Sequence, residues 1–485
     1  MKKNFISYIV AGMALVMLQP ACKTTDIQPV DRISSEVAFT THDKINAAVI
    51  GVYDGLQSPE FLSGRSLIYS DVLGQDVVVA GASAFFYSIY SNTMISTDGY
   101  ATPEWNAGYA AVAKANRTME GIQANLAAAG NDAKAFMAEC EFGRALAYFT
   151  LVNHFAQPYN FTAGATHLGV PLILKSSSAF TSADLVPRAS VGDVYKQIIA
   201  DLKDAEVNLP ADQGDEAVER ANKYAASALL ARVYLYQGDY ANAKAEADKV
   251  INAGVYSLNA DPTACFALGN YTTSESIFSI ANSISDNPNT NNALPMHYNS
   301  QLKGGRADIV VSNTFLTLPG FATDDKRRAL MYSETKGGST LTYCGKYTDV
   351  SGRADWAPIL RYAEVLLTDA EATVRVSGTV DAGSLAKLNQ VRDRSRVSAP
   401  QYTLASFATA NDFINAVLLE RRIELAFEGH RIGDALRNKQ GITGKQNYPD
   451  FSAAADVPYG SDKEIFPIPS TDIKLNPNLV QNPGY

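Results

Sequence analysis

Cysteine is scarce in this chain of 485 residues, which contains only four. Cys22, Cys140, Cys265 and Cys344 show no CxxC spacing. A disulfide framework or a structural zinc site needs cysteines paired at short, regular intervals, so the sequence predicts neither. Cys140 lies in an alanine-rich helical run and is expected to be a small core residue.

An excess of positive charge is also missing. Lys and Arg total 41 against 50 Asp and Glu, which gives a formal net charge of -9 at pH 7. A protein that binds nucleic acid usually carries a basic surface that neutralises phosphates. The composition therefore argues against nucleic acid as a partner.

The common catalytic motifs are absent as well. The five histidines form no HExxH or other metal spacing, and the chain has no GxSxG elbow, GxGxxG turn or P-loop. We therefore expect a protein that is not an enzyme and that binds neither a metal nor a cofactor.

The apolar run at the N-terminus, residues 5–18, is too short for a comfortable membrane span. It follows Lys2 and Lys3 and precedes Ala21 and Cys22, which is the order of an export signal. The stretch resembles a bacterial lipoprotein signal, which implies cleavage before Cys22 and acylation of that cysteine by chains such as palmitate. An ordinary signal peptide with an incidental cysteine is the alternative. We expect a signal peptide over 1–21, a tether over 22–32 and one domain over 33–485.

Residues 222–253 carry the clearest structural pattern in the chain. Two stretches of helical periodicity are separated by Gly238 and Asp239, and Gly238 can adopt the positive φ that ends a helix. Ala231 and Ala243 are small enough for the two helices to approach closely. The spacing resembles a tetratricopeptide hairpin, which cannot bury its apolar face alone and implies further helix pairs stacked against it. A single hairpin inside another fold is the alternative.

Helical periodicity recurs along much of the remaining sequence. It predicts helices from a cap at Thr40 or Thr41 to about Leu56, from a cap at Thr102, and over 133–154, 191–208, 358–376, 384–394 and 411–427. Strand-like pieces at 276–281 and 341–347 lie among residues rich in Gly, Asn and Ser. We expect a mainly α fold of tetratricopeptide-like hairpins. The scaffold covers about 33–57, 103–253 and 357–437, and a loop-rich part with short strands covers about 58–102 and 254–356.

Six further blocks of sequence follow one another in a distinctive order. They are FGRALAYF at 142–149, VPRAS at 186–190, LRYAEVLL at 360–367, LNQVR at 388–392, ERRIELAFEGHR at 420–431 and FPIP at 466–469. Together with the central hairpin they resemble the SusD/RagB outer-membrane lipoproteins of Bacteroidetes-type bacteria. The resemblance implies a lipid-anchored protein at the cell surface that captures glycans, or in some members peptides, and delivers them to a SusC-like TonB-dependent transporter without catalysis.

The block at 420–431 suggests catalysis at first sight. Glu420, Glu424 and Glu428 repeat at intervals of four, and paired carboxylates can cleave glycosidic bonds. Arg421 and Arg422 lie beside them, however, and adjacent guanidinium groups would keep the carboxylates ionised rather than separate their pKa values. The pattern therefore favours structural ion pairs.

Sugar binding requires a different set of side chains. A pyranose ring stacks its C–H face on an aromatic ring while its hydroxyls bond to polar groups. Seven aromatic residues fall within positions 85–109. The candidates for ligand contact are Phe85, Phe86, Tyr87, Tyr90, Tyr100, Trp105, Tyr298 and Arg306, with His297 and Trp356 as further possibilities. Burial beneath the loops is the competing interpretation for each of them, and helix-stripe packing is the favoured one for Tyr109 and Trp105.

Three functions remain open from the sequence. An exposed aromatic arc would favour glycan capture, and a deep polar cavity with charges at both ends would favour an oligopeptide ligand of the RagB type. A bare concave helical groove would favour a structural tetratricopeptide scaffold that binds only proteins.

Overall fold

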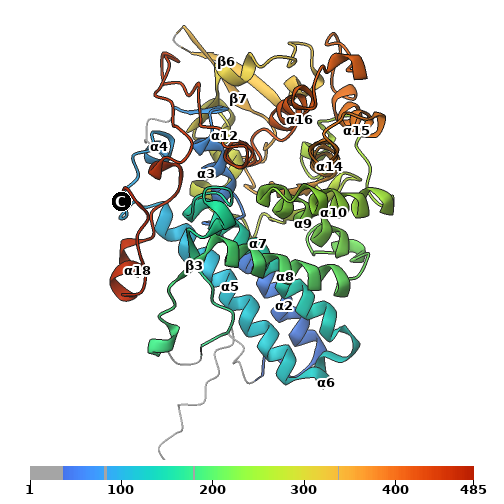
Figure 1. Cartoon of the computed structure of the whole chain (residues 1–485). Helices are drawn as coiled ribbons and strands as arrows, with labels where there is room; N and C mark the ends of the chain where they lie inside the picture. Colours follow the sequence, from blue (N-terminus) through green and yellow to red (C-terminus); the bar gives the residue numbers. More distant parts are fainter. Residues whose placement is uncertain (1–36, 81–84, 178–180, 337) are drawn as a thin grey trace, which may run out of the picture.

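A computed structural model of the chain describes residues 37–80, 85–177, 181–336 and 338–485. The predicted signal peptide and tether, including Cys22, lie outside the described residues. The helix-rich, mainly α fold is confirmed, with helices outnumbering short strands throughout Figure 1.

One layer of long helices occupies the lower half of Figure 1. It contains α2 (His42–Leu56), α5 (Ala101–Ala124), the short α6 (Leu126–Ala129), α7 (Ala133–Phe155) and α8 (Val191–Asn208). A Cβ added at Gly143 of α7 would lie 2.7 Å from Cγ1 of Val52 in α2. Glycine is therefore what allows α2 and α7 to cross so closely.

The predicted central hairpin is formed by α9 (Lys223–Gln237) and α10 (Tyr240–Ala253). Gly238 ends α9 with a φ of 81°, and Ala231 and Ala243 are buried. The hairpin continues a series of packed helices, because α9 contacts α8 while α10 contacts α14. The later helices of this series are α14 (Tyr362–Ser377), α15 (Ala382–Asp393), α16 (Ala410–Glu424) and α17 (Arg431–Arg437).

The loop-rich part carries short elements, and the β6–β7 hairpin lies at the top of Figure 1. Its short helices are α3 (Arg65–Leu73), α4 (Tyr87–Tyr90), α11 (Asn289–Asn292), α12 (Leu294–Tyr298), α13 (Asn313–Leu316) and, near the C-terminus, α18 (Ser470–Leu475). The strands of the described residues form antiparallel pairs. These pairs are β1 (Val77–Val79) with β5 (Ile309–Val311), β2 (Leu168–Pro171) with β3 (Arg188–Ser190), β4 (Ser276–Ile280) with β8 (Ala357–Arg361), and β6 (Met331–Lys336) with β7 (Ser339–Cys344).

Three predicted helix boundaries were wrong. Residues 358–361 form a strand, in which Pro358 lies opposite Ser279, so α14 begins at Tyr362. The helix at 411–427 ends at Glu424, since Phe427 adopts a φ of 65° that a right-handed helix cannot contain. The cap predicted at Thr102 is replaced by Tyr100, one residue before α5 begins.

The chain ends by packing against the helical layer. The backbone N–H of Phe466 donates to the carbonyl of His154 at 2.7 Å, and the side chain of Asn482 donates to the carbonyl of Phe155 at 2.9 Å. A continuous apolar core joins the helical layer, the loop-rich part and this C-terminal segment. Among the described helices, none combines the length and hydropathy required to cross a bilayer.

Candidate functional site

The structure buries four of the aromatic residues proposed as ligand contacts. They are Phe86, Tyr90, Trp105 and Tyr298. Tyr298 donates to a carboxylate oxygen of Asp71, and the Trp105 indole donates to Asp472 at 3.2 Å. These rings pack within the fold, and the polar atoms of Tyr298 and Trp105 bond to other residues of the chain. Burial beneath the loops was the competing interpretation that the sequence left open.

Phe85, Tyr100 and Arg306 lie in a half-buried cluster behind the surface. The Arg306 guanidinium stacks over the Phe85 ring at 4.2 Å and also binds Asp308 at 2.8 Å. The Tyr100 hydroxyl accepts a hydrogen bond from the backbone N–H of Phe86 at 3.0 Å. His297 is fully buried beneath this cluster, and burial lowers its pKa.

Tyr87 differs from its neighbours because its side chain faces solvent. Tyr87 is 54% exposed, whereas the adjacent Phe86 is 0% exposed. Phe86 has a left-handed φ of 63°, and α4 begins immediately after it. The strained turn therefore directs one ring into the core and places the next at the surface.

Tyr87 lines an open pocket of about 530 Å³, here called the Tyr87 pocket. One wall comes from residues 79–80 and 87–92, and the other from the loop at 445–463. Tyr448, which is 44% exposed, supplies a second aromatic ring to the lining. Asn447, Ser461 and Lys463 add polar groups. Two accessible tyrosines and several hydrogen-bonding side chains thus converge on one hollow.

The loop at 445–463 is held in place by its own pairing and by Tyr90. Ile442 bridges Val457 and Gln446 bridges Ala453 in antiparallel fashion. The Tyr90 hydroxyl donates to the carbonyl of Gln446 and accepts from its backbone N–H at 3.1 Å. Tyr90 therefore fixes the two walls of the pocket relative to each other, although it is buried.

Lys445 lies at the base of the Tyr87 pocket and is only 2% exposed. Its ammonium group donates to the carbonyls of Tyr90 at 2.7 Å and Val72 at 3.3 Å, and to the Asn92 side chain at 3.2 Å. Burial lowers the pKa of Lys445 to about 7. The base of the pocket thus holds a buried lysine that is partly protonated near pH 7 and that contacts neutral oxygens and the Tyr90 ring, at 4.7 Å from the ring centre.

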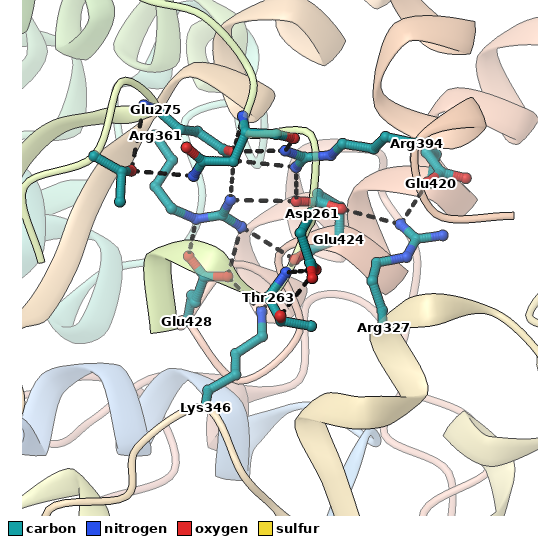
Figure 2. Close-up of polar contacts among 12 residues, drawn as sticks. Asp261, Thr263, Glu275, Arg327, Lys346, Arg361, Arg394, Glu420, Glu424 and Glu428 are labelled. Carbon is teal, nitrogen blue, oxygen red and sulfur yellow. Dashed lines mark hydrogen bonds and ion pairs between the residues drawn. The ribbon is translucent and has the colours of Figure 1, made fainter. Parts of the chain in front are cut away.

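The acidic block at 420–431 contributes to a buried group of ion pairs, here called the Arg361 cluster (Figure 2). Its members are Asp325, Glu275, Glu420, Glu424 and Glu428 with Arg327, Lys346, Arg361, Arg392 and Arg394. The five carboxylates match five cations. Arg394, Arg361 and Arg327 hold the pKa of Glu424 well below its usual range despite burial. Glu424 therefore stays ionised near neutral pH and has no proton to donate.

A second, smaller cavity of about 110 Å³ is lined in part by Ser70 and His154. His154 Nε2 is 2.8 Å from Ser70 Oγ, and His154 Nδ1 is 2.7 Å from Glu104 Oε1. This order matches that of a hydrolytic triad, yet all three side chains are buried, and Ser66 also donates to the same Glu104 oxygen at 2.6 Å. The hydrogen bonds join α3 to α5 and α7, which is a structural role.

The described cysteines and Trp356 are also held within the fold. Cys140, Cys265 and Cys344 are buried free thiols, and burial raises the pKa of each. Trp356 stacks on Tyr271 at 5.4 Å and donates to the carbonyl of Asn282 at 2.9 Å. Within the described ranges, no group of three or more His, Cys, Asp or Glu side chains is arranged to hold a metal ion.

Two family models match the sequence. The SusD family matches residues 322–485, and a family described as starch-binding and associating with the outer membrane matches residues 26–235. SusD-like protein P2 of Formosa agariphila is 28% identical over 540 aligned residues that cover both chains completely. The chain is therefore similar to SusD-type proteins over most of its length.

Solved structures share this fold. A SusD superfamily protein from Bacteroides vulgatus has 28% sequence identity and a TM-score of 0.80, and the match covers 92% of this chain and 99% of that one. Surface glycan-binding protein A from Bacteroides uniformis has 20% identity and a TM-score of 0.74, with 91% and 99% coverage. The second likeness concerns the fold alone.

The sequence identified Tyr87 but missed the opposite wall of the pocket. Tyr448, Asn447 and Lys463 lie in a segment that was assigned neither to the scaffold nor to the loop-rich face. The local signal was Asn447-Tyr448-Pro449-Asp450, an aromatic residue within a turn-forming sequence. An aromatic residue in such a turn is a candidate for exposure, because turns run along the surface.

Proposed function

We propose that the protein is a cell-surface glycan-binding protein and that the Tyr87 pocket is its binding site. The observation that carries the proposal is the pair of exposed tyrosines, Tyr87 and Tyr448, in an open pocket with polar side chains between them. Exposed aromatic rings are costly to leave in water and suit the C–H faces of sugars. The family description of starch binding at the outer membrane supports the same ligand class.

The proposed mechanism is capture without chemical conversion. A sugar ring stacks on Tyr87 or Tyr448 while its hydroxyls exchange water for the side chains of Asn447 and Ser461. The bound glycan then passes to a SusC-like TonB-dependent transporter in the outer membrane. An open pocket of this kind suits release as well as binding, because the ligand is not enclosed.

Affinity electrophoresis of the folded domain in gels that contain single polysaccharides tests this proposal. We expect selective retardation by one polymer class, and Tyr87→Ala or Tyr448→Ala to weaken binding by about 1–2 kcal/mol, or roughly five- to thirtyfold. Neither change should alter the melting temperature much, because both rings are largely solvated. Phe161→Ala is the matched control, since Phe161 is also an exposed aromatic but does not line the pocket.

Two results would contradict the proposal. Equal weakening by Phe161→Ala would show that the effect is not local to the pocket. Failure of every polysaccharide to retard the protein, together with retention of an oligopeptide from a random library, would replace the glycan by a peptide ligand.

The location proposed for the protein is the outer membrane, through a lipid on Cys22. We expect Cys22→Ala to move the protein from the membrane fraction to the soluble fraction, because acyl chains contribute about 0.8 kcal/mol per buried CH₂. Persistence of the variant in the membrane fraction after a salt wash would refute the anchor. Cys140→Ala is the control, since that thiol is buried in the helical layer.

A further inference from the structure

The charge of the Tyr87 pocket has the opposite sign to that of the whole chain. Of the described residues that line it, Lys445 and Lys463 are cationic and Asp456 alone is anionic. The chain itself has a formal net charge of -9. A local excess of positive charge on an acidic protein is not what composition alone would produce.

Neither lysine is neutralised by a described residue. The Lys445 ammonium donates to the oxygens of Val72, Tyr90 and Asn92 and lies 4.7 Å from the centre of the Tyr90 ring. The Lys463 ammonium donates to the carbonyl of Met94 at 3.0 Å and lies 3.6 Å from the centre of the Tyr485 ring. Buried or half-buried cations are usually paired with carboxylates, so these two retain the capacity to attract an anion.

Asn92 connects the two cations. Its side-chain oxygen accepts from Lys445 at 3.2 Å, and its amide donates to the backbone carbonyl of Lys463 at 2.9 Å. Asn92 also adopts a left-handed φ of 56°, which places its amide between the two walls of the pocket. Asn92 therefore joins the Lys445 side chain to the Lys463 backbone, whereas Asp456 is exposed to water and accepts from the Gly444 N–H at 3.2 Å.

We propose that the Tyr87 pocket selects glycans that carry negative charge, as carboxylate or sulfate groups, and that Lys445 and Lys463 supply the attraction. The tyrosines then hold the sugar ring. Lys445 attracts the anionic substituent through its charge, since its three N–H donors already bond Val72, Tyr90 and Asn92, and Lys463 adds a second charge at the pocket wall. This inference rests on the proposed glycan-binding function and specifies the class of ligand for the same pocket.

The test uses two pairs of polymers that differ only in charge. The native gel contains polygalacturonate or its methyl ester, and dextran sulfate or dextran. We expect the wild-type protein to be retarded more by the charged member of at least one pair, and the responding pair identifies carboxylate or sulfate. General attraction to polyanions is not the cause of such retardation, because the whole protein is acidic.

Substitutions of the two lysines test whether the preference for charged polymers arises in the Tyr87 pocket. Lys463→Gln should weaken binding of the charged polymer about two- to fivefold, and Lys445→Met about tenfold, because the buried cation is less screened. Lys196→Gln is the matched control, since it removes one positive charge from an exposed lysine on α8. If Lys445→Met fails to fold by circular dichroism, Lys463→Gln and its control still decide the question.

The outcomes separate this inference from the function on which it rests. Equal retardation by the charged and neutral member of each pair, or equal effects of Lys463→Gln and Lys196→Gln, would overturn charge selection while glycan binding stands. Retardation by a neutral polysaccharide but by no charged polymer would do the same. Failure of all charged and neutral polymers would overturn both.

Discussion

Replacement of Arg361 by methionine tests whether the Arg361 cluster stabilises the fold. Arg361 is buried, and its guanidinium donates to both Glu428 oxygens at 2.7 Å, to Glu275 at 2.5 Å and to Glu424 at 3.2 Å. Methionine fills a similar volume without charge, so the cluster would keep five carboxylates against four cations. Figure 2 shows how Arg361 sits between Glu275 and Glu428.

The expected loss of stability depends on which cations still contact each carboxylate after Arg361 is replaced. Glu428 keeps Lys346 at 2.6 Å, and Glu275 keeps Arg394 at 2.6 Å, so no acid loses every partner. Removing one member of a buried ion pair typically costs 3–5 kcal/mol. We expect the free energy of unfolding to fall by about 3 kcal/mol, the lower end of that range, because the other cations partly compensate.

Urea unfolding followed by circular dichroism measures this change from the shift in midpoint. Lys196→Met is the control, since solvent screens its exposed pair with Asp193, which should contribute little to stability. The double variant Arg361→Met with Glu428→Gln should lose less than the sum of the single changes, because both remove the same contact. A loss below about 1 kcal/mol for Arg361→Met, or strict additivity, would refute the assigned role.

Two further predictions concern packing and pH. Gly143→Ala should destabilise the protein by about 1–3 kcal/mol, because the added methyl group would clash with Val52. Gly51→Ala, at an open helical position, should instead stabilise the protein by about 0.5–1 kcal/mol. The midpoints of urea unfolding should therefore shift in opposite directions in the two variants. Burial raises the pKa of Asp71 from 3.8 to about 7, so its contribution to stability is present below pH 4 and is lost as pH rises through 7. The stability of Asp71→Asn should therefore not show this loss as pH rises. If the free energy of unfolding depends on pH in the same way in the variant and the wild type, Asp71 is not the group responsible.

The sequence predicted those elements whose determinants are local. Gly238 supplied the break between α9 and α10, and Ser190 supplies the cap of α8 by accepting from the N–H of Asp193. The strand β8 was missed because its partner, β4, lies about 80 positions earlier and periodicity carries no information on distant pairing. Pro358 was read as a helix start, although its fixed φ is equally suited to a strand edge.

The candidate site was predicted only in part, for a related reason. The density of aromatic residues near position 85 drew attention to a segment that lines the Tyr87 pocket, but density does not tell which way each ring points. Phe86 and Tyr87 are neighbours in sequence, and the structure buries one and exposes the other. The second wall, with Tyr448, lies more than 350 residues away in sequence and meets the first only through the tertiary fold.

The acidic and basic block at 420–431 contacts residues 71–76, and this segment leads to the proposed binding site. Arg422 binds Asp76 at 2.8 Å, Arg431 binds Gln75 at 3.1 Å, and the Gly429 N–H donates to Asp71 at 3.0 Å. Residues 71–76 lead directly into β1, whose end contributes Val79 to the Tyr87 pocket. Arg422 and Arg431, which lie beside the carboxylates that first suggested catalysis, thus position one wall of the Tyr87 pocket. Because they act on the backbone leading to the pocket rather than on its lining, the lining side chains can differ in ligand preference while the scaffold beneath them stays the same.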